Sequence, residues 1–231
     1  MADAIQPITT EGTPPALIGG HVALDFANTA AWHASDAPSE SLTTYGQFLQ
    51  WAEYAGVLAA AERKRLAVAA DRAPTAAARV LRRTVALREA FYRAAAASAA
   101  GRAAADDDLR AVHAAHVDAL AHATLRPATD VGDGYVVTWT IGSAKTPRTP
   151  NESAGSSLDA RLEVPLWRLA HAAAELLTSG DVGRLRECEG HPCGWLFLDR
   201  SRNRSRRWCD SADCGNRARV RRHLDRRRAR A

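Results

Sequence analysis

Four cysteines constrain the fold of this chain more than any other feature of its sequence. They are the only cysteines among 231 residues, and all of them lie between residues 188 and 214. They form two C-x4-C pairs separated by fifteen residues, and two such pairs supply the four thiolates of a tetrahedral structural zinc site. The sequence therefore predicts a bound Zn²⁺ ion with these ligands: Cys188, Cys193, Cys209 and Cys214.

Other uses of these residues stay open on the sequence alone. Two disulfides would need an oxidising compartment, and residues 1–20 lack the basic start and apolar run of a signal sequence. An iron–sulfur cluster uses the same four ligands. His191 or His223 could replace a thiolate, although four cysteines already complete a tetrahedron. Zinc in a cytoplasmic protein is the favoured interpretation.

The residues between and after the two pairs predict a small fold around the ion. Residues 195–198 (WLFL) are β-prone, and residues 199–205 are polar and turn-forming. Gly215-Asn216 is expected to form a tight turn, and residues 217–230 a helix. A knuckle, a hairpin, a second knuckle and a helix make a treble-clef-like arrangement. It is too small to hold a core, so metal binding would supply its folding free energy, on the order of 10 kcal/mol.

This segment resembles the CGNR zinc-finger family, and residues 20–29 (GHVALDFANT) resemble the opening of the ABATE domain that accompanies it. The resemblance covers most of the chain and is most specific over residues 188–217. It implies a bacterial transcription regulator whose N-terminal domain responds to stress or to a ligand. The residues that carry the zinc-finger resemblance are Cys188, Cys193, Trp195, Asp199, Ser201, Arg202, Asn203, Arg206, Trp208, Cys209, Cys214, Gly215, Asn216 and Arg217.

Charge is unevenly distributed along the chain. Residues 181–231 contain 15 arginines and 7 acidic residues, a net charge of +8, whereas the preceding 180 residues carry a net charge of −3. A nearly neutral body with a strongly basic end is typical of a protein that binds a polyanion at that end.

DNA is the expected polyanion, because arginine presents a planar fork that suits both phosphates and guanine edges. Structured RNA, an acidic protein partner and a solvated basic face without selectivity stay as alternatives. The residues expected to bind nucleic acid are Arg202, Arg204, Arg206, Arg207, Arg217, Arg221 and Arg228.

The rest of the chain is expected to form an ABATE-like sensor domain, residues 20–180, after a flexible lead-in, residues 1–19. The zinc finger with its basic helix would occupy residues 181–231. Alternating apolar residues predict a strand over residues 21–27. Helices are expected at about 44–55, 60–71, 75–99, 106–122 and 165–178, strands at 135–141 and 158–164, and a loop at 145–157. The predicted fold class is α+β: a mainly helical N-terminal domain with a small β-sheet, followed by a treble-clef-like zinc finger.

Two sets of polar residues in this domain are candidate sites. Asp25 and Asn28 could line a pocket for a small molecule, but short polar side chains more often cap a turn, and that interpretation is favoured. The helix expected at 106–122 contains His113, His116 and His122, and the pair three residues apart could bind a metal, but ordinary, partly exposed side chains are the favoured interpretation.

The sequence contains no G-x-S-x-G elbow, no P-loop, no G-x-G-x-x-G and no H-E-x-x-H motif, and a four-thiolate zinc site leaves no open position for catalysis. We therefore expect a non-enzymatic transcription regulator that binds DNA through its zinc finger. A small-molecule effector and a second copy of the chain are further partners that the sequence allows. No membrane partner is expected, because no stretch of about 18 apolar residues occurs.

Overall fold

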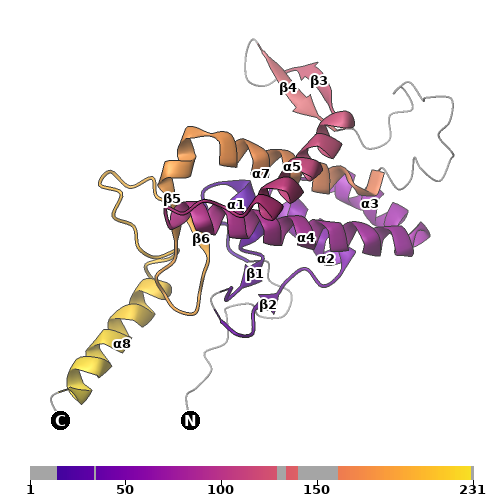
Figure 1. The fold of residues 1–231 in the computed structure, drawn as a ribbon. Coiled ribbons are helices and arrows are strands. Elements are labelled where there is room, and N and C mark those ends of the chain that lie inside the picture. The colour runs from indigo at the N-terminus through magenta and orange to yellow at the C-terminus, as the bar shows by residue number, and fades with distance from the viewer. Residues whose placement is uncertain (1–14, 34, 129–133, 140–160, 230–231) are drawn as a thin grey trace, which may run out of the picture. The chain divides into compact units, whose positions relative to one another are not determined.

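The computed structural model describes residues 15–33, 35–128, 134–139 and 161–229 (Figure 1). The chain divides into two compact units. Unit 1 comprises Met1–Ser41, Tyr92–Ala105 and Leu176–Ala231, and unit 2 comprises Leu42–Phe91 and Asp106–Glu175. Unit 1 thus combines the beginning of the chain with its cysteine-rich end.

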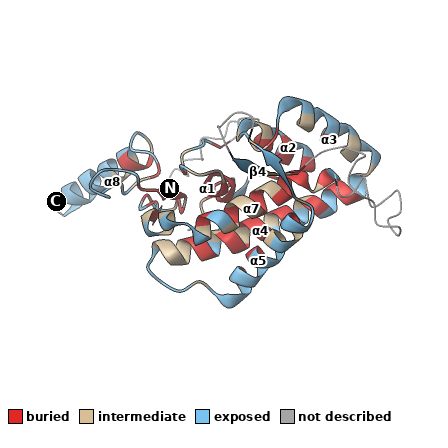
Figure 2. Ribbon diagram, turned by 90° about the horizontal axis from the view of Figure 1, so that it is seen from above, coloured by how far each residue is buried: buried red, intermediate tan, exposed pale blue. Residues whose placement is uncertain are grey.

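Unit 2 is built mainly from helices whose apolar faces are buried. Buried residues run along α4 and α7 (Figure 2), among them Val80, Leu87 and Leu169. The expected helices are confirmed, as is the strand that begins at residue 135. The elements are α2 (Tyr45–Tyr54), α3 (Ala60–Arg72), α4 (Pro74–Ala99, whose end belongs to unit 1), α5 (Asp106–Ala121), β3 (Thr124–Pro127), β4 (Tyr135–Thr138) and α7 (Val164–Thr178, whose end belongs to unit 1).

Local signals in the sequence set the ends of these helices. Thr44 and Gln47 form the predicted capping box, in which the Thr44 hydroxyl accepts a hydrogen bond from the Gln47 N–H at 3.1 Å. Gly56 follows α2 with a φ of 74°, and Gly101 follows α4 with a φ of 66°. Both values lie in the left-handed region that glycine adopts without strain, so both helices end where the sequence predicts.

A polar network joins several elements of unit 2. The Arg168 guanidinium of α7 forms a two-pronged ion pair with Glu62 of α3, with N–O distances of 2.7 and 2.8 Å. It also donates to the carbonyl oxygens of Val57 and Trp139, at 2.7 and 3.0 Å. Because one side chain ties three segments together, Arg168 contributes to the cohesion of the unit.

Unit 1 contains short elements arranged around the cysteines. Two two-stranded antiparallel sheets lie in the described part of this unit, and the pair nearest the cysteines places Leu185 opposite Leu198 and Glu187 opposite Leu196. The elements are α1 (Val22–Ala27), β1 (Ala30–Ala31), β2 (Ser39–Glu40), the 3-10 helix η1 (Gly180–Arg184), β5 (Leu185–Glu187), β6 (Leu196–Leu198) and α8 (Cys214–Arg228).

The strand predicted over residues 21–27 is wrong, because these residues form helix α1. His21 caps the helix, and its imidazole accepts a hydrogen bond from the Ala23 N–H at 3.2 Å. All five residues from Ala23 to Ala27 are buried. The alternation of large and small side chains therefore reflects packing on all sides and not a strand with one face in solvent.

Two other expectations differ from the structure. The strand predicted over residues 158–164 is wrong for its described part, since residues 161–162 are helical and α7 begins at Val164 with Pro165 in its first turn. The tight turn at Gly215-Asn216 is also wrong, because both residues belong to the first turn of α8. The loop at 145–157 and the end of the strand at 140–141 lie outside the described residues.

Within the described ranges, no helix combines the length and the apolar character needed to cross a membrane.

Candidate functional site: a zinc centre and its arginine-rich surroundings

The four cysteine sulfurs converge on one point in unit 1. Their Sγ atoms all lie within 4.8 Å of one another, and the Cys193–Cys209 and Cys209–Cys214 Sγ–Sγ distances are both 3.6 Å. A single zinc ion bound to four sulfurs at about 2.3 Å would set such distances at about 3.8 Å. All four thiols are free and buried, so the disulfide alternative is excluded. The arrangement fits one tetrahedral zinc ion.

Two knuckles bring the thiols together. Cys188 follows β5 and Cys193 precedes β6, and the first knuckle is closed by hydrogen bonds from Cys188 N to Trp195 O and from Cys193 N to Gly190 O, both 2.8 Å. In the second knuckle Cys214 is the first residue of α8. The treble-clef-like fold class is confirmed, but the hairpin expected between the two cysteine pairs is wrong, because β6 pairs with β5 across the first knuckle and residues 199–208 form no strand.

Backbone and side-chain donors surround the sulfurs. The Cys188 Sγ accepts hydrogen bonds from the N–H groups of Gly190 (3.4 Å) and Cys209 (3.3 Å). The Cys214 Sγ accepts from the Arg217 guanidinium at 2.9 Å. Four thiolates and one Zn²⁺ ion carry a net charge of −2, which these donors offset together with the N-terminal end of α8.

The thiols also alter one another's protonation. Hydrogen bonds from the three neighbouring thiols lower the pKa of Cys188. Hydrogen bonding with Cys188 and the other two thiols, together with burial, raises the pKa of Cys209. Four buried thiols this close cannot all ionise without a compensating cation, and a divalent metal ion supplies that charge.

Glycine is required at one position of the first knuckle. A Cβ atom at Gly190 would lie 2.8 Å from the Cβ and 3.1 Å from the Sγ of Cys214. These distances leave no room for a side chain, so Gly190 permits the two knuckles to approach each other.

The arginine-rich residues 199–206, here called the arginine loop, are organised by a buried carboxylate. Asp199 Oδ1 accepts hydrogen bonds from the N–H (2.9 Å) and hydroxyl (2.6 Å) of Ser201, and Oδ2 accepts from the Arg206 N–H at 3.0 Å. Although burial opposes ionisation, these hydrogen bonds hold the pKa of Asp199 below its ordinary value. The loop leaves Arg200, Arg202 and Arg204 exposed at the surface.

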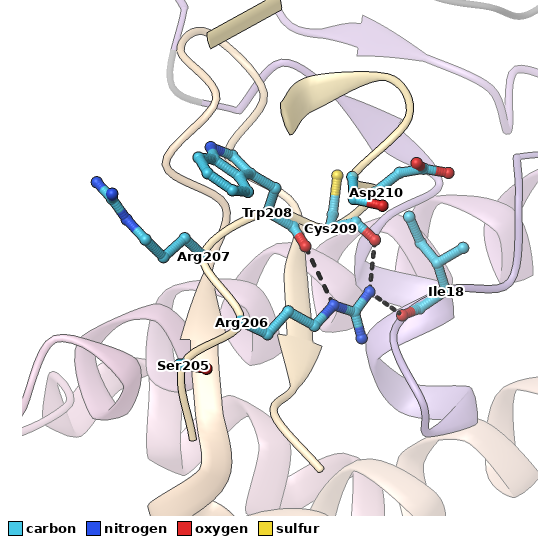
Figure 3. A pocket seen from close by; sticks show the side chains of 8 residues that line it. Ile18, Ser205, Arg206, Arg207, Trp208, Cys209 and Asp210 are labelled. Carbon is cyan, nitrogen blue, oxygen red and sulfur yellow. Dashed lines mark hydrogen bonds between the residues drawn. The ribbon is translucent and has the colours of Figure 1, made fainter. Parts of the chain in front are cut away.

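Arg206 differs from the other arginines of the loop because its guanidinium faces inward. Figure 3 shows it against three carbonyl oxygens, those of Ile18, Trp208 and Cys209, which line a pocket beside the zinc centre. It also lies 4.3 Å from the centre of the Phe197 ring. Arg206 therefore supports the second knuckle.

The remaining arginines expected to bind nucleic acid divide into two groups. Arg217 binds the Cys214 sulfur and forms an ion pair with Asp213 at 3.3 Å, so it supports the zinc centre. The other five are exposed, although Arg207 pairs with Glu189 and Arg221 makes a 3.5 Å contact with the His191 carbonyl. Nucleic-acid binding by this exposed group stays a prediction: Arg202, Arg204, Arg207, Arg221 and Arg228.

Asp25 and Asn28 lie beside the zinc finger, and both have internal partners. The Asn28 side chain donates to Leu196 O and accepts from Leu196 N, both at 2.9 Å. Asp25 Oδ1 accepts from Gly19 N at 2.8 Å, and burial raises its pKa. These partners favour the structural interpretation of both residues, and ligand binding by them stays a prediction.

Sequence reasoning missed how residues 18–30 pack on the zinc finger. Ile18 packs against the cysteine cluster, Gly19 O accepts from Leu198 N at 2.8 Å, and Ala30 O accepts from the Trp195 indole at 3.1 Å. No local pattern marks these contacts. Residues 15–19 of the predicted lead-in thus include contacts to the zinc centre, whereas residues 1–14 lie outside the described residues.

The histidine alternatives do not form a second metal site. His116 stacks on His171 and His122 stacks on Trp167. His191 and His223 are exposed and lie outside the sulfur cluster. Within the described parts of the chain, the four cysteines are the sole cluster of three or more potential ligands at binding distance.

Comparison with protein families agrees with this geometry. A family model named ABATE and described as "Putative stress-induced transcription regulator" matches residues 20–180. The chain belongs to the ABATE family. A second model, described as a CGNR zinc finger, matches residues 184–227 and so includes all four zinc ligands. A comparison with curated proteins finds no match. The resemblance predicted from the sequence is therefore confirmed, and this ABATE protein carries a zinc finger at the end where its charge is most positive.

Proposed function

We propose that this ABATE protein is a transcription regulator that binds DNA through its zinc finger. The observation that carries the proposal is the exposure of α8. This helix buries only Cys214 and Gly215, and it presents six exposed arginines against one acidic residue, Asp225. Figure 2 shows the helix exposed beyond its first turn.

A helix of this kind gains little from the rest of the protein. Isolated helices of about 15 residues are marginal in water, and like charges on neighbouring turns destabilise them further. A bound polyanion neutralises the charge of the arginine side chains, and each guanidinium can form two parallel hydrogen bonds with a phosphate. The zinc ion, when bound, fixes Cys214 and so anchors the start of α8. The exposed arginines of α8 and of the arginine loop would then bind phosphates on either side of one groove.

The N-terminal part of the protein would supply the signal. Residues 18–30 bond directly to β6 and to Arg206, so a ligand or stress that shifts them would be transmitted to the zinc finger without an intermediate element. The proposal includes a small-molecule effector and a homodimer on DNA as ordinary features of such regulators, a cytoplasmic location, and no catalytic activity.

Salt dependence of binding tests the proposal. We expect the zinc-loaded full chain to bind fluorescent duplex DNA with an affinity that falls with salt at a logarithmic slope of about −5, for six phosphate contacts. Removing zinc with a chelator, or the substitution Cys209→Ser, should abolish binding. Arg226→Gln should weaken it, whereas the charge-matched Arg126→Gln, on β3, should leave it unchanged.

A slope near zero would refute nucleic-acid binding. Stronger binding to structured RNA than to duplex DNA at equal salt would favour the RNA alternative. Weak and sequence-blind DNA binding, with capture of an acidic protein that Arg226→Gln abolishes, would favour the protein-docking alternative.

A further inference from the structure

Three of the four residues in the motif that names the zinc finger have contacts at the zinc centre or close to it. Cys214 is a zinc ligand, Gly215 packs so closely that a Cβ would lie 3.3 Å from the Trp208 ring, and Arg217 binds the Cys214 sulfur. Asn216, between them, is exposed, and its amide has no hydrogen-bond partner in the described parts of the chain. Its donor and acceptor are therefore available to a partner outside the chain.

Asn216 begins a row of exposed side chains along α8. At about 100° per residue, positions i, i+4, i+7 and i+11 share one side of a helix. On α8 these are Asn216, Val220, His223 and Arg227, and all four are exposed. Val220 is 51% exposed, so its apolar surface is uncovered. We call this row the Asn216 face.

Arginines border the Asn216 face on both sides, and the helix's one acidic residue lies opposite. By the same helical spacing, Arg219 and Arg226 lie along one border and Arg228 lies beyond the other, whereas Arg221 and Arg222 flank Asp225 on the far side. Asp225 lies on the side of the helix farthest from the Asn216 face. Cations therefore flank the Asn216 face, and the helix's acidic residue lies away from it.

This arrangement matches the major groove of duplex DNA. The groove is about 12 Å wide, which accommodates a helix of about 10–12 Å with its side chains, and phosphates line both of its edges. A helix seated there needs cations along both borders. The side chains along the middle of that helix face lie against the base edges, where an amide and an apolar side chain distinguish one base pair from another.

We propose that the Asn216 face reads base edges in the major groove, with Asn216 recognising adenine. The carboxamide would accept from adenine N6 and donate to adenine N7, as asparagine side chains can. Val220, one turn away, would contact the methyl group of a thymine, and Arg227 would bind guanine O6 and N7. This inference rests on the proposed function, because it specifies how the same helix would select its DNA.

Selection of bound duplexes from a random-sequence library tests the inference. We expect the zinc-loaded full chain to enrich a site with an adenine at one fixed position. Asn216→Ala should lose the preference at that position alone, on the order of tenfold or more in relative affinity, with an unchanged salt slope. Zinc content and circular dichroism confirm that each variant is folded.

Two matched variants separate base reading from general attraction. Arg219→Gln, at the border of the Asn216 face, should weaken binding to all sequences and enrich the same site. Asp225→Asn, on the opposite side of α8, should also enrich the same site. At the selected adenine, 7-deaza-adenine removes the N7 acceptor, and this change should bring the affinity of the wild type close to that of Asn216→Ala.

The outcomes distinguish the two proposals. If the wild type binds duplex DNA with the expected salt slope but enriches no sequence, or if Asn216→Ala enriches the same site as the wild type, the inference is wrong and the proposed function stands. If the zinc-loaded protein binds no duplex, both are wrong.

Discussion

The side-chain amide of Asn28 binds both the N–H and the C=O of Leu196, 168 residues later in the chain. Leu196 belongs to β6, whose other edge pairs with β5. Gly19 O accepts from Leu198 N on the same strand. The free edge of β6 is therefore covered by residues 19–28, and the first knuckle rests on a segment from the beginning of the chain.

Replacing Asn28 should weaken the zinc finger. Asn28→Ala leaves both backbone groups of Leu196 buried without a partner, at a cost of about 2–4 kcal/mol in the free energy of unfolding. Chemical unfolding of the zinc-loaded protein measures this loss, and zinc transfer to a chelator should become faster. Asn203→Ala, at an exposed position of the arginine loop, should change stability by less than about 0.5 kcal/mol. Equal stability of the two variants would contradict the structural role of Asn28.

A methyl group at Gly190 should disrupt the zinc centre. In Gly190→Ala the new Cβ would lie 2.8 Å from the Cys214 Cβ, which forces the knuckles apart. We expect less than one zinc ion per chain and faster zinc loss, measured by metal analysis after dialysis against a weak chelator. Gly183→Ala is the control, because a Cβ there meets nothing within 4 Å. Full zinc retention in Gly190→Ala would show that the knuckles are farther apart.

Two arginines of the arginine loop should respond in opposite ways. Arg206→Gln removes the guanidinium that binds three carbonyls, so we expect a loss of about 2–3 kcal/mol in stability. Arg204→Gln removes an exposed cation, so thermal unfolding should stay unchanged while DNA affinity falls a few-fold. Thermal unfolding measures the stability of both variants, and fluorescence anisotropy measures their affinity for DNA. If Arg206→Gln melts like the wild type, its inward contacts are unimportant.

The Glu62–Arg168 pair should make unit 2 sensitive to acid. The hydrogen bonds from Arg168 hold the pKa of Glu62 below its ordinary value of 4.5, although burial opposes this. Since the folded-state pKa is the lower one, the pair's contribution is complete above about pH 5 and is lost as pH falls through the folded-state pKa. Glu62→Gln should cost about 1–2 kcal/mol at pH 7, after allowance for partial exposure.

Measurement of unfolding from pH 7 to pH 3 tests the acid dependence, because the difference between the wild type and Glu62→Gln should shrink at the acid end. Zinc release at low pH affects both proteins and cancels in this comparison. A constant difference at every pH would mean that Glu62 does not titrate with folding.

Features encoded by neighbouring residues could be predicted from the sequence. The zinc ligands follow from their spacing, and the capping box of Thr44 and Gln47 marks the start of α2. Features set by contacts between residues far apart in the sequence could not be predicted. The pattern of residues 21–27 does not show that both sides of α1 are buried. No residue near Arg206 in the sequence indicates that its guanidinium donates a hydrogen bond to the Ile18 carbonyl. Composition therefore identified the basic surface, but only the fold separates its supporting arginines from its exposed ones.

The cover that residues 19–28 give to β6 limits how this zinc finger can be transplanted. The matched zinc-finger region starts at residue 184, so a graft cut at that boundary would expose the outer edge of β6 and omit the Ile18 carbonyl. A chimaera would need the opening stretch of the donor protein as well, joined by a designed linker. Transfer of this zinc finger alone into unrelated proteins would be disfavoured, because residues 18–28 and the zinc finger must be transferred together.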